Sequence, residues 1–326
     1  MRISTAYFYD HATTQVVQAQ KRITESQSQL ATGKKLINPS DEPDRALLID
    51  RFRTSIARQE AMKGNLDTSD RRLSSQETAI NSAVEVMFRF KELTVQASND
   101  SLAPADREAI SIEMTNLRAQ LLELANSRDD LGHYIFSGSS ATTEPFVSGS
   151  REVLKLNEDT GEWESAQLSS TLYQGDQTST RLTNEQKGQL SFTYSGSEVF
   201  GRVIRNDDST ANEPQSVGFF DVIDDLITAV KDSKPEDIRR GLAESDQLFN
   251  TLDLSLVQLG ADRNNIQQET SIIEGTVLNL RNTLSGIEDL DYSEAVSRMN
   301  REMLAMEAAM SSFSKSSQLS LFNFLR

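Results

Sequence analysis

The sequence predicts a mainly α fold: a nested helical hairpin or coiled-coil bundle with paired terminal helices and a small β-rich inserted domain. Apolar residues recur at four- and three-residue spacing near both chain ends and through the long stretches inside them. Between residues 145 and 214 this spacing stops, and Gly, Ser, Thr and β-branched residues become frequent. The composition agrees, because 37% hydrophobic and 6% aromatic residues are lean for a compact enzyme and normal for long helices packed along seams.

The two chain ends are predicted to form a pair of helices. Apolar side chains in residues 290–326 follow a strict 4-3 spacing, which keeps one seam on one face of a coiled-coil helix. These side chains are Tyr292, Val296, Met299, Met303, Met306, Met310 and Phe313. The first thirty residues repeat the spacing with Ala12, Val16, Ala19, Ile23 and Leu30, and Ser26 fills the one polar step. We therefore predict an assembly interface that consists of Ile3, Val16, Ile23, Leu30, Val296, Met299, Met303, Met306, Met310, Phe313, Leu321 and Phe322.

A connector is predicted after the first helix. That helix is expected to end near Gly33, the residue type preferred just beyond a helix C-terminus, and Lys34 and Lys35 suit the negative end of the helix dipole. Residues 36–46 then carry two prolines in five positions, which restrict the backbone and predict an ordered, extended segment. We assign Asn38, Pro39, Asp41 and Pro43 to this inter-domain connector. The sequence leaves open whether it is a plain linker or a docking segment.

Inner helices are predicted on both sides of the β-rich region. Residues 44–98 place Phe52, Leu66, Leu73, Ile80 and Met87 on one heptad line, and after a break before Pro104 the spacing resumes as far as Leu131. Helix returns at Val217, pauses at Pro235, and then continues to residue 287 as one span of roughly 75 Å. The predicted domains are a terminal helical domain (1–43 with 288–326), a helical bundle (44–140 with 217–287) and a β-rich outer domain (141–216).

The β-rich region contains two local strand signals. Residues 153–163 have the pattern of a hairpin whose turn is Asp159-Thr160-Gly161. Residues 189–196 alternate apolar and polar side chains, as a half-buried strand does. Because both ends of the region join helices, we expect it to project from the helical body.

The composition argues against several function classes. The net charge is −16, and although residues 1–36 are net basic, the acidic interior would repel phosphate backbones and anionic membranes, so no nucleic-acid or membrane partner is expected. No apolar run is long enough to span a bilayer, and residues 1–20 lack the apolar core of a cleavable signal peptide. The chain has no cysteine, which removes disulfides, thiolate nucleophiles and cysteine metal sites.

The sequence contains no catalytic or metal-binding pattern. Its two histidines, His11 and His133, are isolated and belong to no metal-ligand spacing. No glycine-rich phosphate loop or nucleophile-elbow motif occurs, and the abundant Asp and Glu residues are expected at solvated positions of heptad helices. We therefore expect no cofactor, no metal and no enzymatic activity.

Several motifs resemble the flagellin superfamily, over almost the whole chain outside the β-rich region. RFKELTVQASNDSLAPADRE (residues 89–108) is similar to a helix and turn of flagellins, and QLGADRN (258–264) is similar to the matching site on their long returning helix. The chain ends resemble the hook-associated members of the superfamily more than filament flagellins. The stretches that carry this second resemblance are MRIST (1–5), GKKLINPSDEPDRA (33–46), GHYIFSGSSATTEPF (132–146), YQGD (173–176) and SLFNFLR (320–326).

The resemblance implies a secreted, extracellular structural adaptor of the bacterial flagellum that is exported unfolded through the flagellar type III apparatus. Such members join hook-associated protein 1 to the flagellin filament, as a ring of copies at the hook–filament junction. The resemblance also implies that their paired terminal helices line the inner tube and that a cytoplasmic export chaperone holds the C-terminal helix.

Three alternatives remain open at this point. The first is a filament flagellin that self-polymerises. The second is an enzyme with a catalytic insert, although residues 145–214 contain no histidine. The third is a type III tip or effector protein, which also has helical ends. In the free chain we expect residues 1–40 and 290–326 to be mostly unfolded, because thin seams of Ala, Ser and Met bury too little to offset backbone ordering at about 1–2 kcal/mol per residue.

Overall fold

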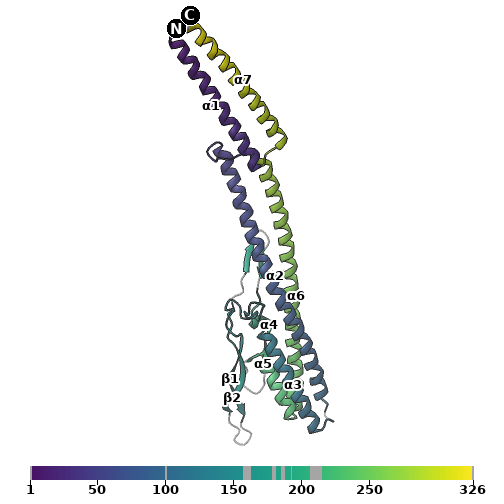
Figure 1. Ribbon diagram of the computed structural model, residues 1–326. Coiled ribbons are helices and arrows are strands. Elements are labelled where there is room, and N and C mark those ends of the chain that lie inside the picture. Colours follow the sequence, from purple (N-terminus) through teal and green to yellow (C-terminus); the bar gives the residue numbers. More distant parts are fainter. Residues whose placement is uncertain are drawn as a thin grey trace. The chain divides into compact units, whose positions relative to one another are not determined.

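The computed structural model describes residues 2–99, 101–156, 163–177, 181–184, 188–191, 193–205 and 215–324. The chain divides into two compact units. Unit 1 consists of Met1–Met62 and Ile272–Arg326, and unit 2 consists of Lys63–Ser271. The three domains predicted from the sequence have other boundaries, and that division stays a prediction. Helices dominate both units (Figure 1), which confirms the mainly α fold class.

The helices are α1 (Arg2–Thr32), α2 (Pro43–Ala97), α3 (Pro104–Ala125), α4 (Gly196–Val199), α5 (Phe219–Lys231), α6 (Pro235–Glu288) and α7 (Tyr292–Phe324). The strands are β1 (Phe146–Leu156), β2 (Trp163–Tyr173), β3 (Arg181–Asn184), β4 (Gly188–Ser191), β5 (Arg202–Arg205) and β6 (Gln215–Gly218). Pro43, Pro104 and Pro235 each begin a helix. Proline suits this position because the first N–H groups of a helix have no partner inside it.

In unit 1, α1 and α7 lie side by side and run antiparallel (Figure 1). The chain leaves α1 at Gly33, whose φ of +69° is the left-handed conformation that glycine adopts without strain. A Cβ atom at this position would lie 2.8 Å from the hydroxyl oxygen of Tyr292, which is the far end of an exposed side chain. The unit 1 parts of α2 and α6 are linked by an ion pair between Glu60 and Arg281.

In unit 2, the helices enclose an apolar core. Leu66, Leu73, Ile80 and Met87 of α2 are completely buried, which confirms the predicted heptad line through these positions. The same core contains, from α3 and α6, Met114, Leu121, Leu252, Leu259 and Ile266. Leu131 was wrongly placed on the line of α3. That helix ends at Ala125, and Leu131 lies in the loop beyond it with 80% of its surface exposed.

The β-rich region forms three two-stranded antiparallel sheets within the described residues, with the orders β1-β2, β3-β4 and β5-β6. The predicted hairpin is the end of β1-β2, where Leu156 lies opposite Trp163. Its predicted turn, Asp159-Thr160-Gly161, lies outside the described residues. At the other end of this sheet Phe146 lies opposite Tyr173.

Two boundaries in this region differ from the prediction. The strand expected over residues 189–196 ends at Ser191, and α4 begins at Gly196. The side chain of Glu198 accepts a hydrogen bond from the N–H of Ser195 at 3.3 Å, and this contact favours a helix start over a continued strand. The helix expected from Val217 begins at Phe219, because Val217 pairs with Val203 in the β5-β6 sheet.

Aromatic rings and one buried amide hold the β-rich region on the helices of unit 2. The rings of Phe146, Phe200, Phe219 and Phe220 pack mainly edge to face, with centroids 5.2–5.4 Å apart in those pairs. Gln76 of α2 is completely buried. Its Nε2 donates hydrogen bonds to the carbonyl oxygens of Ile135, at 2.7 Å, and Tyr194, at 2.8 Å, so one side chain links the segment before β1 to the segment between β4 and α4.

Candidate assembly surface

The predicted seam of α1 faces α7. Ala19, Ile23 and Ser26 are buried. Ala12, Val16 and Leu30 are half-buried. All six positions of the 4-3 pattern therefore turn toward the partner helix, and the predicted pairing of the two chain ends is confirmed.

The face of α7 that contacts α1 consists of two lines of side chains, each repeating every seven residues. One of these lines was predicted and the other was not. Met299, Met306 and Phe313 repeat every seven residues and are half-buried, as predicted, whereas Tyr292, which was predicted to begin the same line, is 55% exposed. Val296, Met303 and Met310, which the prediction also turned toward α1, are 43%, 50% and 48% exposed. Their place in the contact is taken by Ala295, Glu302 and Ala309, which are buried or half-buried. The 4-3 apolar pattern was therefore wrong about one of its two lines.

Two hydrogen bonds explain the choice of line. Positions three and four residues after Met299 flank it on opposite sides, and both choices give a 4-3 spacing. The hydroxyl of Ser26 donates to Oε2 of Glu302 at 2.8 Å, and Nη2 of Arg298 donates to Oε1 of Gln29 at 2.7 Å. These polar contacts and the small Ala295 select a register that apolar spacing alone cannot identify.

The three displaced residues form a feature that we call the α7 stripe: Val296, Met303 and Met310. Repeating every seven residues, they occupy one line along the helix. Tyr7 and Leu304, on the same helix pair, are 71% and 66% exposed. Soluble monomers rarely leave large contiguous apolar surface uncovered, so the stripe is a candidate surface for contact with another chain.

The remaining predicted interface residues lie at the chain ends. Ile3 belongs to α1, and Leu321 and Phe322 belong to α7. Their side chains lie outside the described residues. The assembly role of the whole set stays a prediction.

The predicted connector is an exposed segment. Asn38, Pro39, Asp41 and Pro43 all have exposed side chains, and the N–H of Asp41 donates to the carbonyl oxygen of Asn38 at 3.1 Å in a tight turn. Pro43 begins α2. The exposure is compatible with both readings of the segment, as a linker and as a docking surface.

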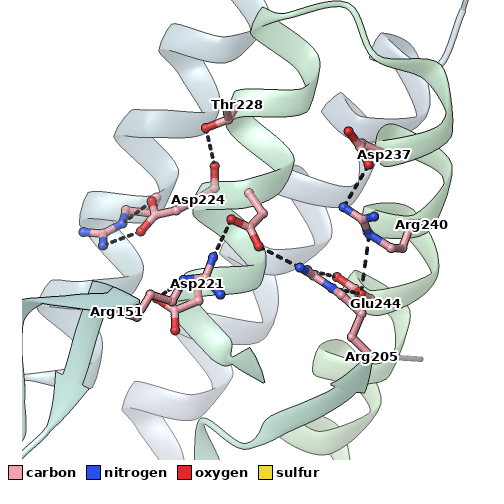
Figure 2. Close-up of polar contacts among 10 residues, drawn as sticks. Arg151, Arg205, Asp221, Asp224, Thr228, Asp237, Arg240 and Glu244 are labelled. Carbon is pink, nitrogen blue, oxygen red and sulfur yellow. Dashed lines mark hydrogen bonds and ion pairs between the residues drawn. The ribbon is translucent and has the colours of Figure 1, made fainter. Parts of the chain in front are cut away.

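Unit 2 contains an ionic network that the sequence did not reveal (Figure 2). Arg205 at the end of β5 donates to both carboxylate oxygens of Glu244 on α6, each at 2.7 Å, and to Asp225 on α5 at 2.9 Å. Arg151 of β1 donates to the other oxygen of Asp225 at 2.5 Å. The side chains of Arg205 and Glu244 are only 12% and 7% exposed. The network therefore joins two strands to two helices through buried charge.

The pKa values in this network, and in the separate Asp224–Arg118 ion pair near it, follow from burial and charge. Burial disfavours the charged guanidinium of Arg205, but hydrogen bonds and attraction from Glu244 and Asp225 outweigh it and raise its pKa above the ordinary value. Burial raises the pKa of Asp224, on α5, against the opposing effect of Arg118, which donates to both of its oxygens at 2.9 Å. The network is thus a structural link, and no acid–base role follows from it.

The described residues offer no site for metal chemistry. Among them, no group of three or more His, Asp or Glu side chains is arranged to hold a metal ion. His11 lies beside the ring of Tyr7, with centroids 6.1 Å apart, and His133 lies 3.7 Å from a carboxylate oxygen of Asp129. In the same described part of the chain, no helix is long and apolar enough to cross a membrane.

Sequence comparison relates this architecture to known proteins. The bacterial flagellin N-terminal helical region matches residues 3–141, and the bacterial flagellin C-terminal helical region matches residues 242–325. Flagellar hook-associated protein 3 of Escherichia coli (strain K12) is 25% identical over an alignment of 336 positions that covers 99% of each chain. Its counterpart of the same name in Salmonella typhimurium is 24% identical over an alignment of 343 positions that covers 100% of each chain. Polar flagellin F of Vibrio parahaemolyticus is 18% identical over 91% of each chain.

Solved structures share the fold. A flagellar hook associated protein-3 from Legionella pneumophila superposes with a TM-score of 0.60 at 17% identity, covering 73% of this chain and 98% of that one. FlgL from Xanthomonas campestris gives a TM-score of 0.57 at 22% identity, covering 73% and 99%.

Proposed function

Because this chain belongs to the bacterial flagellin family, we infer that it is a structural adaptor of the flagellum, of the hook-associated protein 3 type. The observation that carries this inference is the end-to-end match to two hook-associated proteins 3, which includes both terminal helices. Flagellins match at lower identity and over less of the chain. A scaffold of this kind acts through its surfaces, and we expect no enzymatic activity.

The finer proposal concerns position and partners. We propose that the protein is secreted, lies outside the cell at the hook–filament junction, and joins hook-associated protein 1 to flagellin as a ring of copies. The α7 stripe supports this proposal, because a helix pair with one uncovered apolar line gains free energy when neighbouring chains cover it. An export chaperone that holds the C-terminal helix before secretion would cover the same side chains.

The seam of α7 provides the test. We expect Met306→Asp to prevent incorporation, because a charge buried between packed helices costs several kcal/mol, and a ring repeats that cost in every copy. Cells carrying the variant should build hooks and secrete both this protein and flagellin, and should grow no filaments. Asn300→Asp is the matched control, because it introduces the same charge at an exposed position of the same helix. Normal filaments on the Met306→Asp strain, at wild-type protein level, would refute the junction proposal for this helix.

A filament flagellin remains the second candidate, since polar flagellins of Vibrio match most of the chain. The two functions differ in self-assembly. A flagellin grows long filaments from purified protein, whereas we expect this protein to remain unpolymerised alone and to add only to a hook that carries hook-associated protein 1. Electron microscopy of the purified chain, with and without isolated hooks, separates them.

A further inference from the structure

One carboxylate, that of Glu288, forms ion pairs at the point where the chain leaves α1 and enters α7. Glu288, the last residue of α6, has a side chain that is only 8% exposed. Its Oε1 forms ion pairs with Nζ of Lys34 and with Nη2 of Arg53, the second at 2.5 Å. Lys34 precedes the connector and Arg53 follows it on α2. A single side chain therefore links both ends of the connector to α6.

The backbone around Glu288 is fixed as well. Its carbonyl oxygen accepts a hydrogen bond from the N–H of Lys35 at 2.8 Å, and the N–H of Leu290 donates to the carbonyl oxygen of Gly33 at 2.9 Å. Asp291 then caps α7, because its Oδ1 accepts from the N–H of Ser293 at 2.9 Å. We call residues 33–35 and 288–291, together with Arg53, the clasp.

A chain of hydrogen bonds leads from the clasp into the terminal pair. Nε2 of Gln29 on α1 donates to the carbonyl oxygen of Lys35 at 2.8 Å, and its Oε1 accepts from Arg298 on α7 at 2.7 Å. One turn farther along α7, Glu302 accepts from Ser26. These contacts couple the two helices to each other and to the clasp.

Burial within the pair is more complete in the half on the clasp side than in the half toward the chain ends. Ala19, Ile23 and Ser26 of α1 and Ala295 of α7 are buried, although Leu30 and Met299, nearer the clasp than some of these, are half-buried and Tyr292 is exposed. Farther from the clasp, Val16, Met306 and Phe313 are half-buried, and no described side chain beyond them is buried. The buried side chains of the described pair therefore all lie in the half on the clasp side.

Chain topology gives the clasp an energetic role. Gln29 and Arg298 are 269 residues apart, and bringing two such distant segments together carries an entropic cost of loop closure. The clasp brings the last residues of α1 and the first residues of α7 together, so each further turn adds contacts without closing another large loop. Ordering that starts at the clasp is therefore favoured over ordering that starts at the chain ends.

We propose that the clasp is the point from which the terminal helices order, so that α1 and α7 pair outward from Glu288 toward the chain ends. This coupling is a property of the single chain and does not depend on the flagellar function. We expect both chain ends to be mostly unfolded in the free chain. The proposal adds that the helical turns next to the clasp are the part of these ends that stays ordered.

Hydrogen exchange of the purified full chain, followed by mass spectrometry, tests the proposal. In the wild type, amides of residues 23–35 and 292–302 should exchange more slowly than those of residues 7–16 and 306–315. Glu288→Gln should speed exchange in both near segments about tenfold, the change expected when a charge-assisted contact loses its charge. Arg53→Gln should have a smaller effect, because Lys34 remains paired with the carboxylate.

The matched control is Glu60→Gln, which removes an exposed ion pair between α2 and α6 in the same unit and should leave the near segments unchanged. Amides of α3 report whether unit 2 stays folded. If Glu288→Gln loosens α3 as well, the milder Lys34→Gln variant decides in the same measurement, with faster exchange near the clasp supporting the proposal. Equal exchange in near and far segments of the wild type, or unchanged near segments in these clasp variants, would overturn it.

Discussion

The bundle of unit 2 and the terminal pair of unit 1 share a 4-3 apolar spacing but bury different side chains. In unit 2, Leu73, Ile80 and Phe90 have no exposed surface. Among the described side chains of the terminal pair, the completely buried one is an alanine, Ala295, while Met303 of the same helix stays 50% exposed. The comparison teaches that the spacing of apolar residues decides which face of a helix is apolar. Whether that face is buried within the chain depends on the volume of its side chains and on the helix that packs against it.

The largest effect should come from emptying the core of unit 2. Leu73→Ala removes a completely buried side chain, and we expect it to lower the free energy of unfolding by about 3–5 kcal/mol. Denaturant unfolding followed by circular dichroism measures this change. Val257→Ala, at a position 63% exposed, is the control and should change the free energy by about 0.5 kcal/mol or less. Similar losses of unfolding free energy for the two variants would show that Leu73 is no more important for stability than an exposed residue.

A smaller but clear effect should follow from breaking the ionic network. Arg205→Gln leaves the buried carboxylate of Glu244 without its bidentate partner, and we expect a loss of about 3 kcal/mol. Arg239→Gln removes an ion pair whose cation is 67% exposed and should cost less than about 0.5 kcal/mol. The same denaturant experiment compares them. An Arg205→Gln variant as stable as its control would mean that the strands do not depend on this charge link.

The terminal pair should respond weakly to the same kind of truncation. Ile23→Ala removes one of its few buried side chains, yet we expect the free chain to lose less than about 1 kcal/mol, because the pair adds little to cooperative unfolding. Limited proteolysis should trim both ends and leave a core from near residue 45 to near residue 285. If Ile23→Ala lowered the free energy of unfolding as much as Leu73→Ala, or if the first cuts fell within residues 110–130, the terminal pair would not be the less stable of the two regions.

The smallest expected effect is a pH dependence within unit 2. The pKa of Asp224 is raised above its ordinary value of 3.8, chiefly by burial. The folded state then holds the proton more tightly than the unfolded state, so ionisation of Asp224 weakens folding as pH rises from 3.8 through the folded pKa. In thermal unfolding, the wild type should therefore gain stability relative to Asp224→Asn as pH falls through this window. A gain in the opposite direction would show that attraction to Arg118 outweighs burial.

Much of the fold could be predicted from the sequence because its helices are long and strongly periodic. The line from Leu66 to Met87 and the α1 seam required only the heptad spacing. The choice between Glu302 and Met303 could not be predicted, because it depends on Ser26, a hydroxyl on a helix at the other end of the chain. The ionic network was missed for a similar reason, since Arg205 and Glu244 belong to different elements and neither lies in a recognisable motif.

The pairing of α1 with α7 also determines when during synthesis or export the two helices can come together. Ser26 and Glu302 are hydrogen bonded across 276 residues of chain, so a ribosome or an export channel that delivers residues from the N-terminus releases one partner long before the other. Throughout that interval α1 has no α7 to pair with, and a chain that stops short of Glu302 cannot complete the contact. The α1–α7 pair, which carries the surface that we propose for a neighbouring chain, is therefore completed last, and its formation requires that both helices have been delivered.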